Sequence, residues 1–293
     1  MNNTCARWVA VTGLAVLTAA GCGRRNTGNS LTIKGSDTMV ILGQRWAEAY
    51  MKAHPNLVIQ VTGGGSGTGI AALINGGTDI CQASRPMKPE EFAQVKERRG
   101  VEAKEIAVAI DGIALYVHEH STLRSLTLDQ IKGIFQAKIT DWKALGAEKG
   151  TIVPYGRENS SGTYAYFKEH VLKTEDFAAS VQSLPGTAAV VNAVAKDPRA
   201  IGYGGIAYAK GVRPLKISAA KGKPALEPTK ELVTSGKYPI SRKLFFYTAG
   251  EPQGAAADFV AWVRSAEGQQ VCAEVGYFPL PPASAPKKIR PKG

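Results

Sequence analysis

Cysteine, histidine and methionine are scarce in this sequence of 293 residues, which contains four of each. Cys5 and Cys22 lie near the N-terminus, so the remaining cysteines are too few for a disulfide framework. Acidic residues are also few, because 24 Asp and Glu face 36 Lys and Arg, giving a net charge of +12. That charge is compatible with nucleic acid, an anionic surface or a small anion. The polar stretches lack the length and the interleaved aromatic residues of a nucleic-acid surface, so we expect no nucleic-acid partner.

Long apolar runs are missing except near the N-terminus, where one extends from Trp8 to Ala20. It is shorter than the roughly 20 residues that span a bilayer, and it matches the apolar region of a secretory signal. The small residues before Cys22 resemble a bacterial lipobox, although Ala19 stands where leucine is usual. We therefore expect a lipoprotein signal peptide over 1–22, a tether over 23–30 and a lipid anchor on Cys22. Plain secretion is the alternative, and either process exports the chain.

The mature chain keeps Cys81 and Cys272, which are far apart in sequence. An exported protein can oxidise such a pair, but sequence gives no distance between them. A disulfide and two buried thiols both remain open.

The composition and the order of elements predict an α/β protein with two interleaved lobes. Hydrophobic residues make up 44 % and charged residues 20 %, which excludes bulk disorder, and the length fits two domains. Strand, loop and helix patterns alternate along the chain, which predicts mostly parallel sheets. Strands are predicted over 31–34, 57–62, 79–82, 106–110, 113–117, 152–155, 201–204 and 244–248. Helices are predicted over 40–54, 70–75, 89–99, 128–135, 164–172, 190–196, 255–265 and 268–275. Residues 281–293, rich in Pro and Lys, predict a disordered basic tail.

Three loops of one kind carry the chemistry: 35–38 (Gly-Ser-Asp-Thr), 63–69 (Gly-Gly-Gly-Ser-Gly-Thr-Gly) and 159–163 (Asn-Ser-Ser-Gly-Thr). Each follows a predicted strand and opens a helix, where unpaired N–H donors and the helix dipole favour an anion. Glycine allows close approach, and Ser and Thr add hydroxyl donors. Arg157 precedes the third loop and can add a bidentate charged contact. Helix capping without a ligand explains any one loop, but three such loops together predict an oxyanion site.

Competing motifs are incomplete. Residues 63–69 lack the lysine of a nucleotide-binding loop, and Gly-x-Ser-x-Gly is missing around Ser66 and Ser161. No cluster of acidic or cysteine residues accompanies His118 and His120, so a metal site is not indicated there. We therefore expect no enzyme activity, no cofactor and no metal.

The loop residues also resemble a known family, the phosphate-binding proteins of bacterial phosphate ABC transporters. The resemblance covers about residues 31–280. It rests on 33–38, 63–69, Ala83-Ser84-Arg85-Pro86, 111–114, 157–163, 201–204 and Tyr238-Pro239-Ile240-Ser241-Arg242. It implies a type II periplasmic-binding-protein fold, with the ligand between lobe I (31–112 and 244–280) and lobe II (113–243). Residues 111–117 and 243–248 resemble its two hinge strands.

The same resemblance implies the ligand-binding residues. They are Ser36, Asp37, Thr38, Ser66, Arg85, Arg157, Ser161, Gly162 and Thr163. Arg85 stands where the best-known members carry an aspartate that accepts the proton of hydrogen phosphate and rejects sulfate. Asp37 can replace that acceptor, or selectivity can weaken. A salt bridge from Arg85 to Asp79 or Asp37 is the structural alternative.

The resemblance implies a monomeric, exported and lipid-anchored receptor that captures inorganic phosphate and delivers it to an ABC permease in the membrane. Receptors for sulfate, molybdate or tungstate are the alternative within the same class. A phosphate-sensing or adhesion lipoprotein is an alternative of another class. A hydrolase using Ser66 or Ser161 requires a positioned base or metal, and the sequence offers neither.

Overall fold

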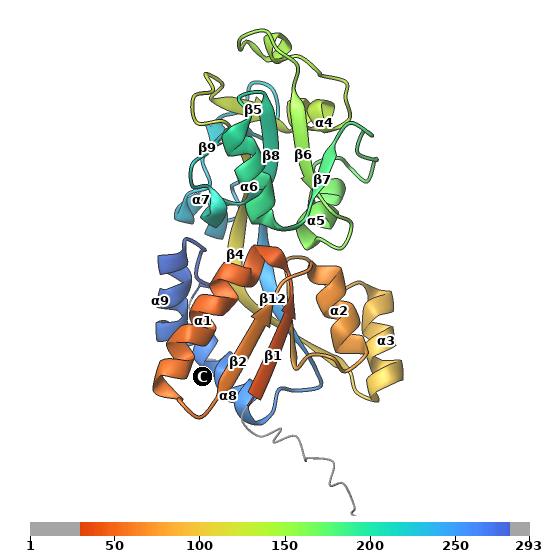
Figure 1. Cartoon of the computed structure of the whole chain (residues 1–293), viewed down its shortest axis with the longest axis vertical. Helices are drawn as coiled ribbons and strands as arrows, with labels where there is room; N and C mark the ends of the chain where they lie inside the picture. Colours follow the sequence, from red (N-terminus) through yellow and green to blue (C-terminus); the bar gives the residue numbers. More distant parts are fainter. Residues whose placement is uncertain (1–29, 282–293) are drawn as a thin grey trace, which may run out of the picture.

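Two α/β lobes joined by two long strands form the part of the chain that the computed structural model describes, residues 30–281 (Figure 1). The predicted signal peptide with Cys22, residues 23–29 of the tether and residues 282–293 of the tail lie outside the described residues. Between residues 30 and 281, no helix is both long enough and apolar enough to cross a membrane. The two-lobe α/β fold predicted from the sequence is confirmed.

Lobe I is drawn at the bottom of Figure 1 and is a sheet covered by helices on both faces. Its strands lie in the order β2 (Val58–Thr62), β1 (Ser30–Gly35), β3 (Ile80–Ala83), β12 (Ser241–Ala249) and β4 (Ala103–Val117). One face carries α1 (Val40–Ala53), α8 (Gly254–Val263) and α9 (Ala266–Val275), and the other carries α2 (Ser66–Ile74) and α3 (Pro89–Arg99).

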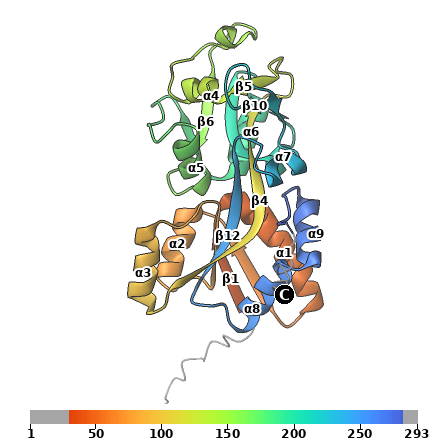
Figure 2. The ribbon, with the colours of Figure 1, turned by 180° about the vertical axis from the view of Figure 1, so that it is seen from behind.

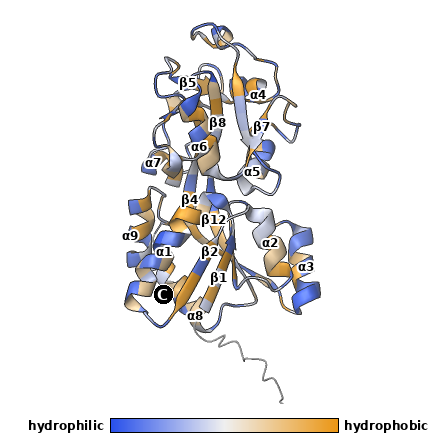
Figure 3. Cartoon of the chain, viewed as in Figure 1, coloured by the Kyte–Doolittle hydropathy of each residue, from blue (hydrophilic) through white to orange (hydrophobic). Residues whose placement is uncertain are grey.

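Side-chain alternation in the strands builds the two cores of lobe I. In β12, Phe246 packs with Trp46 on the α1 side, whereas its neighbour Phe245 packs in the core under α2 and α3. Successive strand residues point to opposite faces, so one strand serves both cores. Cys81 lies in the α2–α3 core and Cys272 in the opposite one, and both are free thiols. The disulfide alternative is therefore excluded. In Figure 3 the strands are mainly hydrophobic, and α3 is strongly hydrophilic on its solvent side.

Lobe II has a similar layout around β8 (Ala200–Gly205), β6 (Val153–Arg157) and β7 (Gln182–Leu184), with β9 (Arg213–Pro214) on β4. Its helices are α4 (Leu128–Phe135), α5 (Gly162–His170), α6 (Gly186–Lys196) and α7 (Lys230–Thr234). The largest core packs Phe135, Phe167 and Tyr203 in mutual aromatic contact. A small sheet of β11 (Ala225–Leu226), β10 (Lys216–Ser218) and β5 (Ser125–Thr127) lies beside it.

The two lobes share the strand β4, which runs through both (Figure 2). It pairs with β12 from Ala103 to Gly112 and with β8 from Ile113 to Val117. The sheet is consequently continuous between the lobes, and β4 with β12 forms the connection. We keep the lobe boundaries proposed from the sequence, and we call the segment where β4 changes partner the hinge.

Several sequence predictions need correction. The strands predicted over 106–110 and 113–117 are one strand, because Asp111 and Gly112 keep the ladder to Arg242 and Ser241. Among residues 30–281 only five of the ten strand pairings are parallel, since β12 and β4 run antiparallel to their neighbours. Helices α2, α5 and α6 begin two to four residues earlier than predicted, because their first turns are rich in Gly, Ser and Thr rather than apolar residues.

Candidate functional site

The first loop, residues 35–38, packs against Gln82 of strand β3. Gly35 has φ +140, and a Cβ there would overlap the Gln82 carbonyl oxygen, so only glycine fits this close approach. The Ser36 N–H donates to the same carbonyl at 2.8 Å, and the Ser36 hydroxyl donates to Ser84 Oγ at 2.8 Å. Ser36 and Thr38 are both buried at the start of the helix that follows.

The second loop reaches across to lobe II. Ser66 is the first residue of α2, and its hydroxyl accepts the Ser84 N–H at 3.0 Å. The Gly67 N–H donates to the Ser160 carbonyl at 2.9 Å. Gly65 has φ +93, and a Cβ there would lie 2.5 Å from that carbonyl oxygen. The glycines in this loop therefore allow backbone of the two lobes to touch.

The third loop meets the first two from lobe II. Ser161 caps α5, and its hydroxyl accepts the N–H groups of Thr163 at 3.1 Å and of Tyr164 at 3.2 Å. A Cβ on Gly162 would overlap the Ser66 hydroxyl and lie 2.7 Å from that of Ser84. The hydroxyls of Thr163 and Thr38 are 2.7 Å apart. All three predicted loops thus converge, in what we call the polar cluster: Ser36, Thr38, Ser66, Ser84, Arg157, Ser161, Gly162 and Thr163.

Asp37 joins the three loops electrostatically. Its Oδ2 accepts from Arg157 Nη2 at 2.8 Å and its Oδ1 accepts from the Gly64 N–H at 2.9 Å. Arg157 is 2 % exposed and also donates to Thr187 Oγ1 at 2.8 Å. Burial lowers the pKa of the Arg157 guanidinium, and the Asp37 carboxylate opposes that shift. Asp37 uses two of about four acceptor positions on its carboxylate, so it retains capacity for another donor.

Arg85 is directed elsewhere. Its guanidinium forms a bidentate pair with Glu91 of α3, at 2.8 and 2.7 Å, and donates to the Pro86 carbonyl at 2.9 Å. The predicted alternatives, a salt bridge to Asp79 or to Asp37, were wrong, because the partner is Glu91. Within residues 30–281, no hydrogen bond joins Arg85 to the polar cluster. The structure does not bring this predicted site residue to the other eight.

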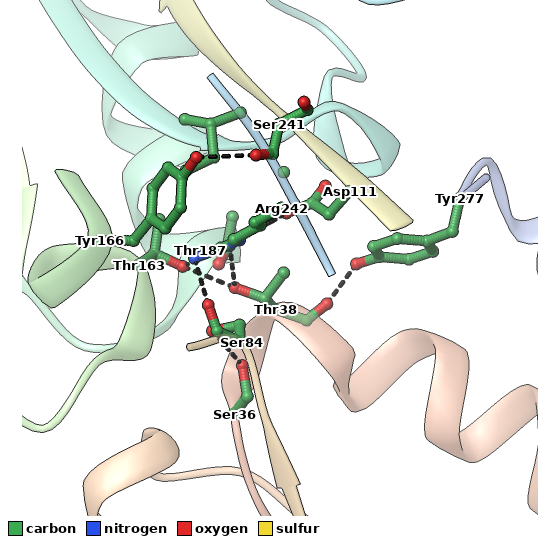
Figure 4. A network of polar contacts seen from close by, with 12 residues as sticks. Ser36, Thr38, Ser84, Asp111, Thr163, Tyr166, Thr187, Ser241, Arg242 and Tyr277 are labelled. Carbon is green, nitrogen blue, oxygen red and sulfur yellow. Dashed lines mark hydrogen bonds and ion pairs between the residues drawn. The ribbon is translucent and has the colours of Figure 1, made fainter. Parts of the chain in front are cut away.

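Arg242 is a buried cation that the sequence analysis did not assign to the site. It lies on β12 and donates to Asp111 Oδ2, to the Ser84 carbonyl and to Thr163 Oγ1, at 2.9, 2.8 and 2.9 Å (Figure 4). Sequence offered one signal for it, since Arg242 ends the motif 238–242, but nothing there indicated its contacts. Ser84, within the motif 83–86, was missed in the same way, whereas Thr187 lies in no motif and carried no sequence signal.

The arrangement of donors can bind an oxyanion. Each of the three arginines has its own carboxylate partner (Arg85 with Glu91, Arg157 with Asp37, Arg242 with Asp111), so hydroxyls, backbone N–H groups and the N-termini of α2 and α5 supply much of the attraction. Among the described residues, the hydroxyls of Ser66 and Ser161 have no hydrogen bond to a histidine or carboxylate that could activate them. No group of three metal-binding side chains occurs between residues 30 and 281.

Comparison with known proteins gives consistent matches. A family model described as a PBP superfamily domain matches residues 22–267. The phosphate-binding protein PstS of Pseudomonas aeruginosa is 34 % identical over 281 residues, covering 90 % of this chain and 87 % of the relative. PstS of Bacillus subtilis is 33 % identical over 264 residues, covering 88 % and 83 %.

Similar solved structures are also described as phosphate transport proteins. One from Clostridium perfringens, described as a phosphate ABC transporter substrate-binding protein with bound phosphate, has a TM-score of 0.79 at 32 % identity, covering 86 % of this chain and all of the other. An ABC-type phosphate transport receptor from Vibrio cholerae has a TM-score of 0.68 at 25 % identity, covering 85 % and 99 %.

Proposed function

The chain belongs to the PstS family of phosphate-binding proteins within the PBP superfamily, and on that premise we propose that it captures inorganic phosphate between its lobes for an ABC-type permease. The observation that carries this function is the convergence of donors from both lobes. Thr38 and Ser66 come from lobe I, and Ser161 and Thr163 come from lobe II, all of them buried. An anion at this junction contacts both lobes at once.

Binding follows from lobe movement. The polar cluster is buried, so an anion reaches it only when the lobes separate. Donors from both lobes contact the anion only when they close again, so the anion favours the closed form. Arg85 occupies the position of the family's aspartate, cannot accept a proton and is paired with Glu91. Asp37 keeps an unused acceptor position on its carboxylate, so it is our candidate to accept the proton of hydrogen phosphate. Sulfate has no proton to donate, so Asp37 is our candidate for selectivity.

The test is radiolabelled phosphate binding to the chain from Gly23, stripped of endogenous ligand, with sulfate, molybdate and tungstate as competitors. Saturable phosphate binding that sulfate does not displace supports the proposal. Preferential binding of another oxyanion assigns the chain to that anion instead. Binding of none of them rejects a transport receptor and favours the adhesion alternative.

Export and anchoring form a separate part of the proposal. We propose that the chain is lipidated at Cys22 and retained at a membrane, where it supplies the permease. A Cys22→Ser variant then appears in the soluble extracytoplasmic fraction, whereas the wild-type chain stays with the membrane. If the wild-type chain is found in the soluble extracytoplasmic fraction to the same extent as the Cys22→Ser variant, plain secretion is the better explanation.

A further inference from the structure

Arg242 connects the hinge to both sides of the polar cluster. Its strand neighbour across the hinge is Asp111, and Nε and Nη2 both donate to Asp111 Oδ2, at 3.2 and 2.9 Å. Nη1 donates to the carbonyl of Ser84, which belongs to lobe I. The side chains of both charged residues are at most 3 % exposed.

One nitrogen of Arg242 donates hydrogen bonds to a threonine from each lobe. Nη2 donates to Thr163 Oγ1 of lobe II at 2.9 Å and to Thr38 Oγ1 of lobe I at 3.4 Å, and these two hydroxyls are 2.7 Å apart. The pair shares one hydrogen bond between its hydroxyls, so one hydroxyl proton remains to donate to a further acceptor. Figure 4 shows this convergence around the guanidinium.

Helix α5, which carries Thr163, has a second link to the hinge. The Tyr166 hydroxyl donates to the Ser241 carbonyl at 2.7 Å, and the Arg242 guanidinium lies over the Tyr166 ring, 5.4 Å from its centre. The hinge therefore contacts the start of α5 through both hydrogen bonds and a cation–π contact. These contacts all join protein groups to one another.

Burying an ion pair is costly unless its hydrogen bonds are well satisfied. Arg242 meets that condition only when Thr163 is in place, because Thr163 supplies its acceptor from lobe II. Arg242 lies beside the hinge and has an acceptor in each lobe, so separation of the lobes removes either Thr163 or the Ser84 carbonyl and leaves the bonds to Asp111. The pair consequently favours the closed form.

We propose that Arg242 is a positioning residue that sets the balance between the open and closed lobes, rather than a residue that recognises the anion. This inference rests on the proposed function. A change in the closed fraction alters the apparent affinity for every ligand of the closed form by the same factor. Substitutions at Arg242 should therefore weaken binding without changing selectivity.

The main variant is Arg242→Lys, which keeps the charge beside Asp111, although one ammonium group cannot serve Asp111, Ser84 and both threonines together. Its matched control is Lys243→Arg, the reverse exchange at the exposed neighbour on the same strand. Titration calorimetry measures phosphate and arsenate binding, and small-angle X-ray scattering of the stripped proteins measures lobe separation.

We expect Arg242→Lys to weaken both anions by about tenfold, with their affinity ratio unchanged, and to increase the radius of gyration without ligand. Lys243→Arg should match the wild type. Unchanged affinity and scattering in Arg242→Lys would overturn the inference, as would a changed affinity ratio, which indicates direct anion contact. If Arg242→Lys does not fold, the double variant Asp111→Asn with Arg242→Gln removes both charges, and the same outcomes apply. A wild type that binds neither anion rejects the proposed function, while the scattering comparison still decides the role of Arg242.

Discussion

Replacement of Arg157 by glutamine tests the centre of the polar cluster. Arg157 lies just before the third loop and is held by Asp37 from lobe I and Thr187 from lobe II. It is buried in the closed form, and it is the cation that the resemblance to the family assigns to the anion. The Arg157→Gln variant removes the charge and leaves the Asp37 carboxylate without its ion-pair partner.

Two effects then lower phosphate affinity. A hydrogen bond to a charged group contributes about 1.5–3 kcal/mol, so losing even one weakens binding by about tenfold or more. The freed carboxylate adds repulsion toward the anion, which is on the order of 4 kcal/mol for unit charges 4 Å apart near a protein surface. We expect a total loss of at least about 2 kcal/mol, which is about thirtyfold in the dissociation constant.

The assay is titration calorimetry with phosphate on the stripped chain. The matched control is Arg199→Gln, which removes an equal charge from an exposed ion pair with Asp197 in lobe II. A second variant, Asp37→Asn combined with Arg157→Gln, removes the repulsion and should recover part of the affinity. Equal affinities for Arg157→Gln and Arg199→Gln would refute the assigned site, provided that both variants unfold at the wild-type temperature.

Further predictions concern the closure of the lobes, Arg85 and the two thiols. Gly162→Ala should reduce the phosphate affinity measured by calorimetry at least about a hundredfold, because the added Cβ overlaps the Ser66 hydroxyl when the lobes close. The control Gly150→Ala adds a Cβ where there is open space and should bind phosphate normally. Arg85→Gln should bind phosphate within about twofold of the wild type. Burial raises the pKa of Glu91, but the Arg85 hydrogen bonds, the Lys88 N–H and the positive charges of both residues together bring it below the ordinary value of 4.5. The stability that Arg85→Gln loses in urea unfolding should therefore be present at neutral pH and shrink as the pH falls below 4.5. A large affinity loss would place Arg85 at the anion after all. Burial also raises the pKa of both cysteine thiols, so neither should react with a thiol reagent until the chain unfolds, and fast reaction of the native protein would contradict the buried assignment.

Much of lobe I and most helices could be predicted from local pattern. The Val40–Ala53 and Pro89–Arg99 helices match their predicted spans to within a residue, because apolar spacing and a proline at the first turn mark them. The helix predicted over 128–135 is α4, which Thr127 caps with Gln130 completing the capping box. Short strands such as β9 and β11, two residues each, carry too little pattern to be seen.

The site could be predicted in outline because each loop is local, but its charge pairing depends on long-range contacts. Asp37 and Arg157 are 120 residues apart, and Asp111 and Arg242 are 131 apart. A single sequence does not encode such pairings in any spacing. Asp111 was interpreted as a break between two strands because its partner Arg242 is distant in sequence. Arg85 differs, since its partner Glu91 is only six residues away but was not considered among the alternatives.

Selectivity for phosphate over sulfate is tested most directly by calorimetric titration of the stripped chain from Gly23. Each anion is titrated at a pH below and a pH above the second ionisation of phosphate. Our account predicts tight phosphate binding at both values and no sulfate binding, with Asp37 accepting the phosphate proton. Sulfate binding comparable to that of phosphate would contradict it, because the polar cluster would then bind tetrahedral anions whether or not they carry a proton.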